Sequence, residues 1–211
     1  MIKAAPSILA ADGLNLERDV ARMAQAGCDW VHVDIMDAHF VPNLSYGPAV
    51  VKALRPRFQL PLDVHLMMDN PDAYIDVFCD AGADVLTIHA EIPGDIAGML
   101  KRIRARGVKA GLALKPATAP AEVAPLLPLC DVCLVMSVEP GFGGQSFMPQ
   151  VVDKLPALRQ LGFAGEIEMD GGINMDNIGT LAQAGLDVAV MGTALYRHAA
   201  PAEAIAAIHR L

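Results

Sequence analysis

The chain has 211 residues, of which 54% are hydrophobic, so it can build one substantial core but is short for two full domains. Its 24 acidic and 16 basic residues give a net charge of −8, which repels nucleic acid and anionic membrane surfaces unless a basic patch exists locally. No run of lysine and arginine supplies such a patch, and we expect neither nucleic acid nor a membrane as a partner.

Short apolar runs recur along the chain with helical patterns between them, which is typical of parallel βαβ units. Eight strands are predicted, at residues 4–9, 30–36, 62–67, 85–89, 109–114, 132–136, 166–170 and 188–192. Helices are predicted at residues 15–26, 71–81, 96–106, 148–160, 175–184 and 201–210.

A short repeat marks the places where helices end and strands begin. The pattern Ala-Gly-x-Asp occurs at residues 26–29, 81–84 and 184–187, and glycine there fits the left-handed position that terminates a helix. Eight such units predict an α/β fold, a single-domain (β/α)8 TIM barrel over residues 1–211. The rival is a doubly wound open sheet, which usually has a glycine-rich turn after its first strand, and residues 6–9 are not one.

The termini and cysteines give two further expectations. The first 11 residues lack the blocks of a secretory signal, and no stretch reaches the roughly 20 apolar residues of a membrane span, so we expect a soluble, cytoplasmic protein. Of the four cysteines only Cys130 and Cys133 form a CxxC motif, and no matching second pair exists for zinc. Reduced structural thiols are the expectation.

Polar residues gather at predicted strand ends, where TIM barrels carry their chemistry. His32 and Asp34 are two apart on one strand and therefore point into the barrel together, and the same alternation turns His65 inward on the next strand. Asp170 ends the seventh strand. Singly, each could be a hydrogen-bonded interior group, but four together predict a site for a divalent metal such as Zn²⁺, Fe²⁺, Mn²⁺ or Co²⁺.

Glycine-bearing loops follow the last three predicted strands. They contain Gly141, Gly143, Gly144, Gly171, Gly172 and Gly192, the last followed by Thr193. Barrels often bind phosphate at this position, because glycine lets backbone N–H groups approach the oxygens. One such loop is usually only a tight turn, but three neighbouring loops favour a phosphate site.

Three methionines, Met36, Met67 and Met136, fall at strand ends beside these polar residues. They could simply fill the core, or they could form an apolar lid that shields a reacting carbanion from water. His89 ends the fourth strand and is open between a structural role and a role beside the metal or substrate. His39 lies in the loop after the second predicted strand and is expected near the site without binding metal.

Five motifs occur in order along nearly the whole chain: APSIL at 5–9, HVDIMDAHFVPN at 32–43, DVHLM at 63–67, VEPGFGGQ at 138–145 and DGGI at 170–173. Together they resemble the ribulose-phosphate 3-epimerase family. The resemblance implies a barrel that interconverts D-ribulose 5-phosphate and D-xylulose 5-phosphate in the pentose phosphate pathway.

The resemblance also implies roles for the residues singled out above. His32, Asp34, His65 and Asp170 would hold one divalent metal ion per subunit, and Asp34 and Asp170 would be the acid/base groups that work through a 2,3-enediolate. The small phosphorylated ketose would be bound by Ser7, His65, Gly141, Phe142, Gly143, Gly144, Asp170, Gly171, Gly172, Gly192 and Thr193. We expect the chain to form a homo-oligomer.

One residue departs from the family pattern: Ala38 stands where a glycine is usual, in a loop where glycine can serve a special backbone angle. Three other functions stay open. They are epimerisation of allulose 6-phosphate, metal-dependent hydrolysis, since His-x-Asp and a further histidine can hold a metal-bound hydroxide, and phosphosugar binding without catalysis.

Overall fold

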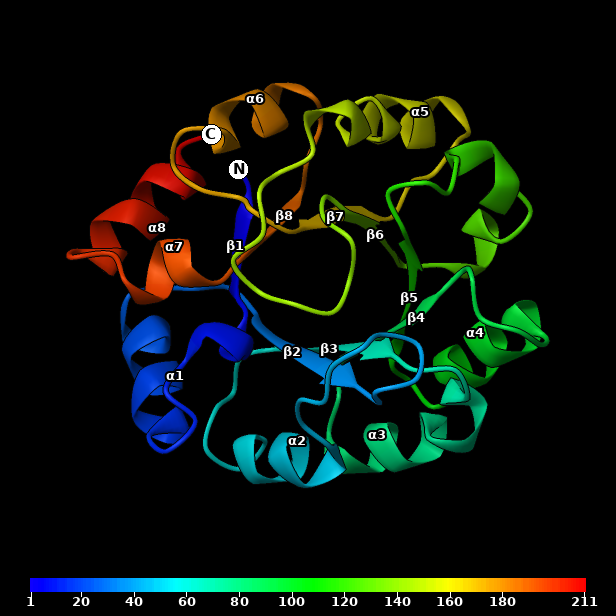
Figure 1. The fold of residues 1–211 in the computed structure, drawn as a ribbon, viewed down its shortest axis with the longest axis horizontal. Helices are drawn as coiled ribbons and strands as arrows, with labels where there is room; N and C mark the ends of the chain where they lie inside the picture. The colour runs from blue at the N-terminus through cyan, green and yellow to red at the C-terminus, as the bar shows by residue number, and fades with distance from the viewer.

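The computed structural model describes residues 1–211, and its strands form a ring that helices surround (Figure 1). The strands are β1 (Lys3–Pro6), β2 (Val31–Met36), β3 (Leu62–Met67), β4 (Val85–His89), β5 (Lys109–Leu114), β6 (Val132–Met136), β7 (Glu166–Asp170) and β8 (Val188–Met191). The α-helices are α1 (Leu16–Gln25), α2 (Pro48–Leu54), α3 (Ile75–Ala81), α4 (Ile96–Ala105), α5 (Lys154–Gln160), α6 (Ile178–Gln183), α7 (Thr193–Tyr196) and α8 (Pro201–His209). Short 3-10 helices lie in the connections: η1 (Ile8–Ala10), η2 (Pro71–Ala73), η3 (Pro120–Val123), η4 (Leu127–Leu129) and η5 (Pro149–Val151).

The eight strands form one parallel sheet in which each strand neighbours the next along the chain, and β1 pairs with β8. The sheet closes between β1 and β2, where Ser7 and His32 form a parallel bridge and the Trp30 N–H donates to the carbonyl of Ala4. This arrangement confirms the predicted α/β class and (β/α)8 TIM barrel, and it brings the carboxyl ends of all eight strands to one rim.

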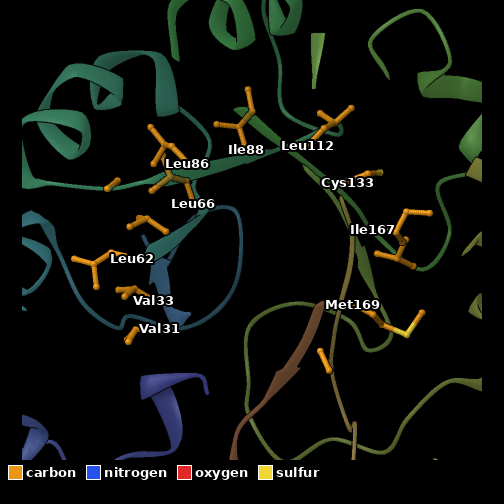
Figure 2. Packing of buried hydrophobic residues seen from close by; sticks show 14 of the residues in the cluster. Val31, Val33, Leu62, Leu66, Leu86, Ile88, Leu112, Cys133, Ile167 and Met169 are labelled. Atoms are coloured by element: carbon orange, nitrogen blue, oxygen red, sulfur yellow. The ribbon is translucent and has the colours of Figure 1, made fainter. Parts of the chain in front are cut away.

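The main hydrophobic core lies between the strands and the helices. Alternate strand residues such as Val33, Leu66, Leu86 and Ile167 belong to it, and Figure 2 shows part of this cluster on several neighbouring strands. The other alternate residues face the barrel interior. Since the outer layer supplies most of the apolar burial, the interior near the rim is free to carry polar groups.

The glycine repeat has the predicted conformation. Gly27, Gly82, Gly107, Gly162 and Gly185 all have φ angles between 75° and 104°, in the left-handed region that a residue with a Cβ rarely adopts. These glycines end helices shortly before strands β2, β4, β5, β7 and β8 begin.

Several predicted boundaries are wrong. The first strand ends at Pro6 rather than at residue 9, because the Ser7 hydroxyl accepts from the N–H of Leu9 and starts η1. The predicted helices 71–81 and 148–160 each begin with a 3-10 turn, η2 and η5, before the α-helix starts. The short helices α2 and α7 were not predicted.

All four cysteines are free, as expected, and burial raises the pKa of the thiols of Cys28, Cys130 and Cys133. Buried thiols of this kind are unreactive and serve as small apolar groups. None of the helices combines the length and the apolar character that crossing a membrane requires.

Candidate functional site

Strand register brings the predicted polar cluster together. In the pairing of β2 with β3, Asp34 lies opposite His65 and Met36 lies opposite Met67. Because side chains alternate along a strand, His32, Asp34 and Met36 share one face, and all three are buried. The expected inward alignment of His32, Asp34 and His65 is therefore present.

The centre of the cluster is the Asp34 carboxylate. Its Oδ1 atom lies 3.2 Å from His32 Nε2 and 3.2 Å from His65 Nδ1, while its Oδ2 accepts a 2.6 Å hydrogen bond from the Ser7 hydroxyl. One donor atom from each of His32, Asp34, His65 and Asp170 lies within 4.8 Å of the others. Two imidazoles and two carboxylates at this spacing fit a divalent transition-metal ion.

The pKa values of the two aspartates are shifted in opposite directions. Burial raises the pKa of Asp170 to about 7, and the nearby charge of Asp34 adds to this rise. Burial also opposes ionisation of Asp34, but the charge of His32 and the close contacts of both imidazoles with the carboxylate outweigh it and hold the pKa of Asp34 well below its ordinary value. Asp34 therefore favours the charged form, whereas Asp170 binds a proton much more readily than an ordinary aspartate does.

A second set of buried groups lies directly behind His32. Its Nδ1 atom is 2.5 Å from Asp63 Oδ2 and 3.7 Å from Glu168 Oε1, and all three side chains are fully buried. Burial, followed by the charge of Asp63, raises the pKa of Glu168 well above its ordinary value. If His32 held a metal ion through Nε2, its one remaining ring proton would lie on Nδ1 and would be donated to Asp63, which would fix the orientation of the ring.

A cavity of about 1010 Å³ opens above the cluster at the rim of the barrel. All the sequence-predicted site residues line it except His32 and His65, which are fully buried. Figure 1 shows the long loop after β6 lying over the centre of the ring, where it contributes Gly141 and the exposed Phe142 to the cavity wall. Asn43 donates a 2.7 Å hydrogen bond to the carbonyl of Gly141 and ties this loop to the one after β2.

Two glycines after β7 are required by close packing. Gly171 and Gly172 have φ angles of 121° and 64°, and a Cβ atom at Gly172 would lie 2.6 Å from the backbone nitrogen of Phe147. The Ser137 hydroxyl donates to the carbonyl of Gly171 at 2.6 Å. The loops after β6 and β7 are therefore packed against each other through backbone atoms, as a concave anion site would need.

The two remaining histidines lie in different places. His39 lines a separate cavity of about 460 Å³ beside Asp37 and does not reach the four-residue cluster. His89 is fully buried, and its Nε2 atom lies 2.9 Å from Nε2 of His65. His89 is therefore in contact with the cluster but is separated from the cavity.

Sequence reasoning missed Arg197, which follows α7. Arg197 is the only basic residue among those that line the cavity, close to Gly192 and Thr193, and its exposed side chain makes no hydrogen bond or ion pair. A single arginine between the last predicted strand and the last predicted helix gave no signal, because its position beside the glycine loops follows from the three-dimensional structure.

Comparison with known proteins adds to this geometry. Residues 3–196 match the model of the ribulose-phosphate 3 epimerase family. The ribulose-phosphate 3-epimerase of Mycobacterium bovis is 49% identical over 210 residues, which cover 98% of this chain and 91% of the relative. The cytoplasmic isoform of ribulose-phosphate 3-epimerase from Oryza sativa subsp. japonica is 42% identical over 212 residues, covering 99% of this chain and 93% of the relative. The tryptophan synthase A-subunit of Pyrococcus furiosus, at 12% identity and a TM-score of 0.73 over 100% of this chain and 98% of that one, shares the fold.

Proposed function

The chain belongs to the ribulose-phosphate 3-epimerase family, and from that premise we propose that it interconverts D-ribulose 5-phosphate and D-xylulose 5-phosphate by moving a proton at C3. Residues 1–211 would act as one catalytic domain. The observation that carries the proposal is the pair Asp34 and Asp170, which face one cavity and have pKa values shifted in opposite directions. Removal of a C3 proton and its return to the opposite face require one base and one acid.

The four-residue cluster is proposed to hold one divalent ion through His32, Asp34, His65 and Asp170. His65 is fully buried, so we assign it to the metal and not to a separate substrate contact. A bound divalent ion supplies Lewis-acid stabilisation to the negative charge that forms on substrate oxygens when the C3 proton leaves. The donor set suits Zn²⁺, Fe²⁺, Mn²⁺ and Co²⁺.

Asp34 and Asp170 are proposed to exchange roles with the direction of reaction. In one direction Asp34, as the charged group, takes the C3 proton, and Asp170 delivers its own proton to the other face of the 2,3-enediolate. In the other direction Asp170 starts charged and takes the C3 proton, while Asp34 starts protonated and delivers its proton to the other face. The two titrations are coupled because Asp34 lies close to Asp170, as the raised pKa of Asp170 reflects.

The phosphate end of the substrate is proposed to lie against the loops after β6, β7 and β8. The backbone N–H groups of these loops would bind the phosphate oxygens, through Gly141, Phe142, Gly143, Gly144, Gly171, Gly172, Gly192 and Thr193. Arg197 lines the same wall and offers the positive charge that the acidic chain otherwise lacks there. Ser7 is proposed to contact the sugar as well as Asp34.

Met36, Met67 and Met136 are proposed to shield the reacting carbon from water. All three line the cavity beside the aspartates and are nearly fully buried. Met136 lies opposite Asp170 in the pairing of β6 with β7. An apolar wall at this point strengthens electrostatic interactions within the site, because it lowers the local dielectric constant.

We also propose that the protein acts in the cytoplasm, as the name of the rice relative suggests for that enzyme, within the pentose phosphate pathway. Its partner is proposed to be a small phosphorylated ketose, with neither nucleic acid nor a membrane involved, and the chain is proposed to form a homo-oligomer.

The test is proton NMR of the metal-loaded protein with D-ribulose 5-phosphate in deuterated water. Loss of the C3 proton signal with formation of xylulose 5-phosphate is expected. An unchanged signal would reject the pentulose substrate, and the same experiment with allulose 6-phosphate then tests the hexulose epimerase. Cleavage of the substrate without exchange at C3 would point to hydrolysis instead.

A further inference from the structure

The two ring nitrogens of His65 have different neighbours. Nδ1 lies 3.2 Å from Asp34 Oδ1, whereas Nε2 lies 2.9 Å from Nε2 of His89. Both rings are fully buried, so water does not complete this contact. A contact between two ring nitrogens takes a single proton, and the ring that supplies this proton decides which nitrogen of His65 keeps a lone pair.

Glu91 determines the direction of that hydrogen bond. Its Oε2 atom lies 3.0 Å from His89 Nδ1, while its Oε1 accepts from the N–H of Lys115 at 2.8 Å and from the hydroxyl of Thr118. Although burial raises the pKa of Glu91, the hydrogen bonds from His89, Thr118 and Lys115 lower it to about 2. A carboxylate in this position only accepts, so the proton of His89 lies on Nδ1.

The position of the proton on Glu91's neighbour determines the position of the proton on the next ring. His89 Nε2 is the acceptor, so His65 Nε2 carries a proton and donates it. We propose that Glu91, acting through His89, holds His65 in the tautomer whose Nδ1 lone pair is free for a divalent cation. Glu91 and His89 are thus positioning residues, and the inference rests on the metal site of the proposed function.

The loop after β5, whose donor groups bind the Glu91 carboxylate, is itself fixed by a helix on the outside of the barrel. Lys154, on α5, donates from Nζ to the carbonyls of Lys115 at 2.8 Å and Thr118 at 2.7 Å. These are the two residues whose donor groups bind Glu91 Oε1. A continuous series of contacts therefore connects α5 and the loop after β5 to one ligand of the metal.

Replacement of Glu91 by Gln gives a sharp test, because it keeps the shape and reverses the donors. The fixed N–H of Lys115 requires the Gln carbonyl oxygen, so the Gln amide NH₂ faces His89 and donates to Nδ1. His89 then donates from Nε2, and His65 must accept at Nε2 and carry its proton on Nδ1, where it blocks the metal. Glu91→Ala removes the control of the tautomer without imposing the wrong one. A packing role would give the opposite order, since Gln fills the site better than Ala.

The experiment measures Zn²⁺ affinity by competition with a chelator, together with long-range ¹H–¹⁵N NMR of the histidine rings. We expect E91Q to bind Zn²⁺ about 10- to 100-fold more weakly than wild type and more weakly than E91A, with the ring nitrogens of His89 showing the reversed tautomer. E122Q is the control. Glu122 lies in the connection after β5, as Lys115 and Thr118 do, and accepts at 2.7 Å from the N–H of Ala119, but it makes no hydrogen bond with His89.

Two results would overturn the inference. One is E91Q with wild-type Zn²⁺ affinity, and the other is E91Q that binds more tightly than E91A with unchanged ring tautomers. A wild-type protein that binds no divalent ion would be a different outcome, because it would reject the metal site of the proposed function itself.

Discussion

The Ser7 hydroxyl donates a 2.6 Å hydrogen bond to Asp34 Oδ2 at the seam where β1 meets β2. A hydrogen bond to a charged acceptor contributes about 1.5–3 kcal/mol, and this one fixes the carboxylate that we propose as a base. We expect Ser7→Ala to lower kcat about tenfold or more while the metal content stays near that of wild type. Steady-state kinetics with metal analysis checks this, and a rise in KM alone would mean that Ser7 serves only to bind substrate.

The two aspartates should fail in different ways when they are changed singly. Asp34→Asn and Asp170→Asn should each lower epimerisation by about 10²- to 10⁴-fold, the usual effect of losing an acid/base group. The remaining carboxylate serves one face of the sugar, so each variant should exchange the C3 proton of one substrate epimer faster than that of the other. Deuterium exchange followed separately for the two pentulose phosphates measures this, and turnover near wild type would contradict the acid/base assignment.

Arg197 should affect binding more than turnover. It carries the only positive charge on the cavity wall and makes no ion pair, so Arg197→Gln should raise KM for the phosphorylated substrate about tenfold with a small change in kcat. Arg197→Lys should recover part of the loss. Arg57→Gln is the control, since Arg57 is exposed and its ion pair is a 3.7 Å contact with Glu17 on the surface. Equal kinetics of Arg197→Gln and wild type would show that the backbone alone binds the phosphate.

Glu91 should make stability depend on pH in the acid range. Its pKa falls from 4.5 to about 2 on folding, so its contribution is present above pH 4.5 and is lost as the pH drops toward 2. In thermal unfolding with a chelator present, Glu91→Gln should unfold at a lower temperature than wild type at pH 7. This difference should shrink between pH 4.5 and 2, and a constant difference would argue against an ionised Glu91.

Ala38 is the only non-glycine residue with a positive φ angle, 60°. The left-handed conformation costs an alanine roughly 1–2 kcal/mol, which glycine avoids, while glycine loses about 0.4–1 kcal/mol through unfolded-state entropy. Ala38→Gly should therefore raise the free energy of unfolding by up to about 1.5 kcal/mol. Ala26→Gly, at φ −72°, should lower it instead. Denaturant unfolding of both variants makes the comparison.

The sequence predicted strands such as β3 and β4 well, because the residues that mark their ends lie next to them in the sequence. The strands at 62–67 and 85–89 have the predicted bounds, since each is a buried run with polar residues and proline or glycine nearby on either side. His32, Asp34 and His65 were predicted to face inward by simple alternation, and Ala38 was identified as a residue where glycine would suit the backbone.

What the sequence did not predict depends on register and on side-chain contacts between distant segments. The pairing that places Asp63 behind His32 requires the alignment of β2 with β3, and the contact from Glu91 to Thr118 requires β4 beside β5. The early end of β1 depends on a hydroxyl cap at Ser7, which competes with a run that otherwise reads as a strand.

The pairing of β1 with β8 also has a consequence for the time at which the site is completed. Lys3 and Val188 are register partners although almost the whole chain separates them, and contacts of such long range form slowly because a large loop must close first. A chain still on the ribosome, with β7 and β8 unmade, lacks Asp170 and cannot close the ring. The four-residue cluster can therefore form only when the polypeptide is finished. We expect the metal ion to bind after release from the ribosome rather than to guide the first steps of folding.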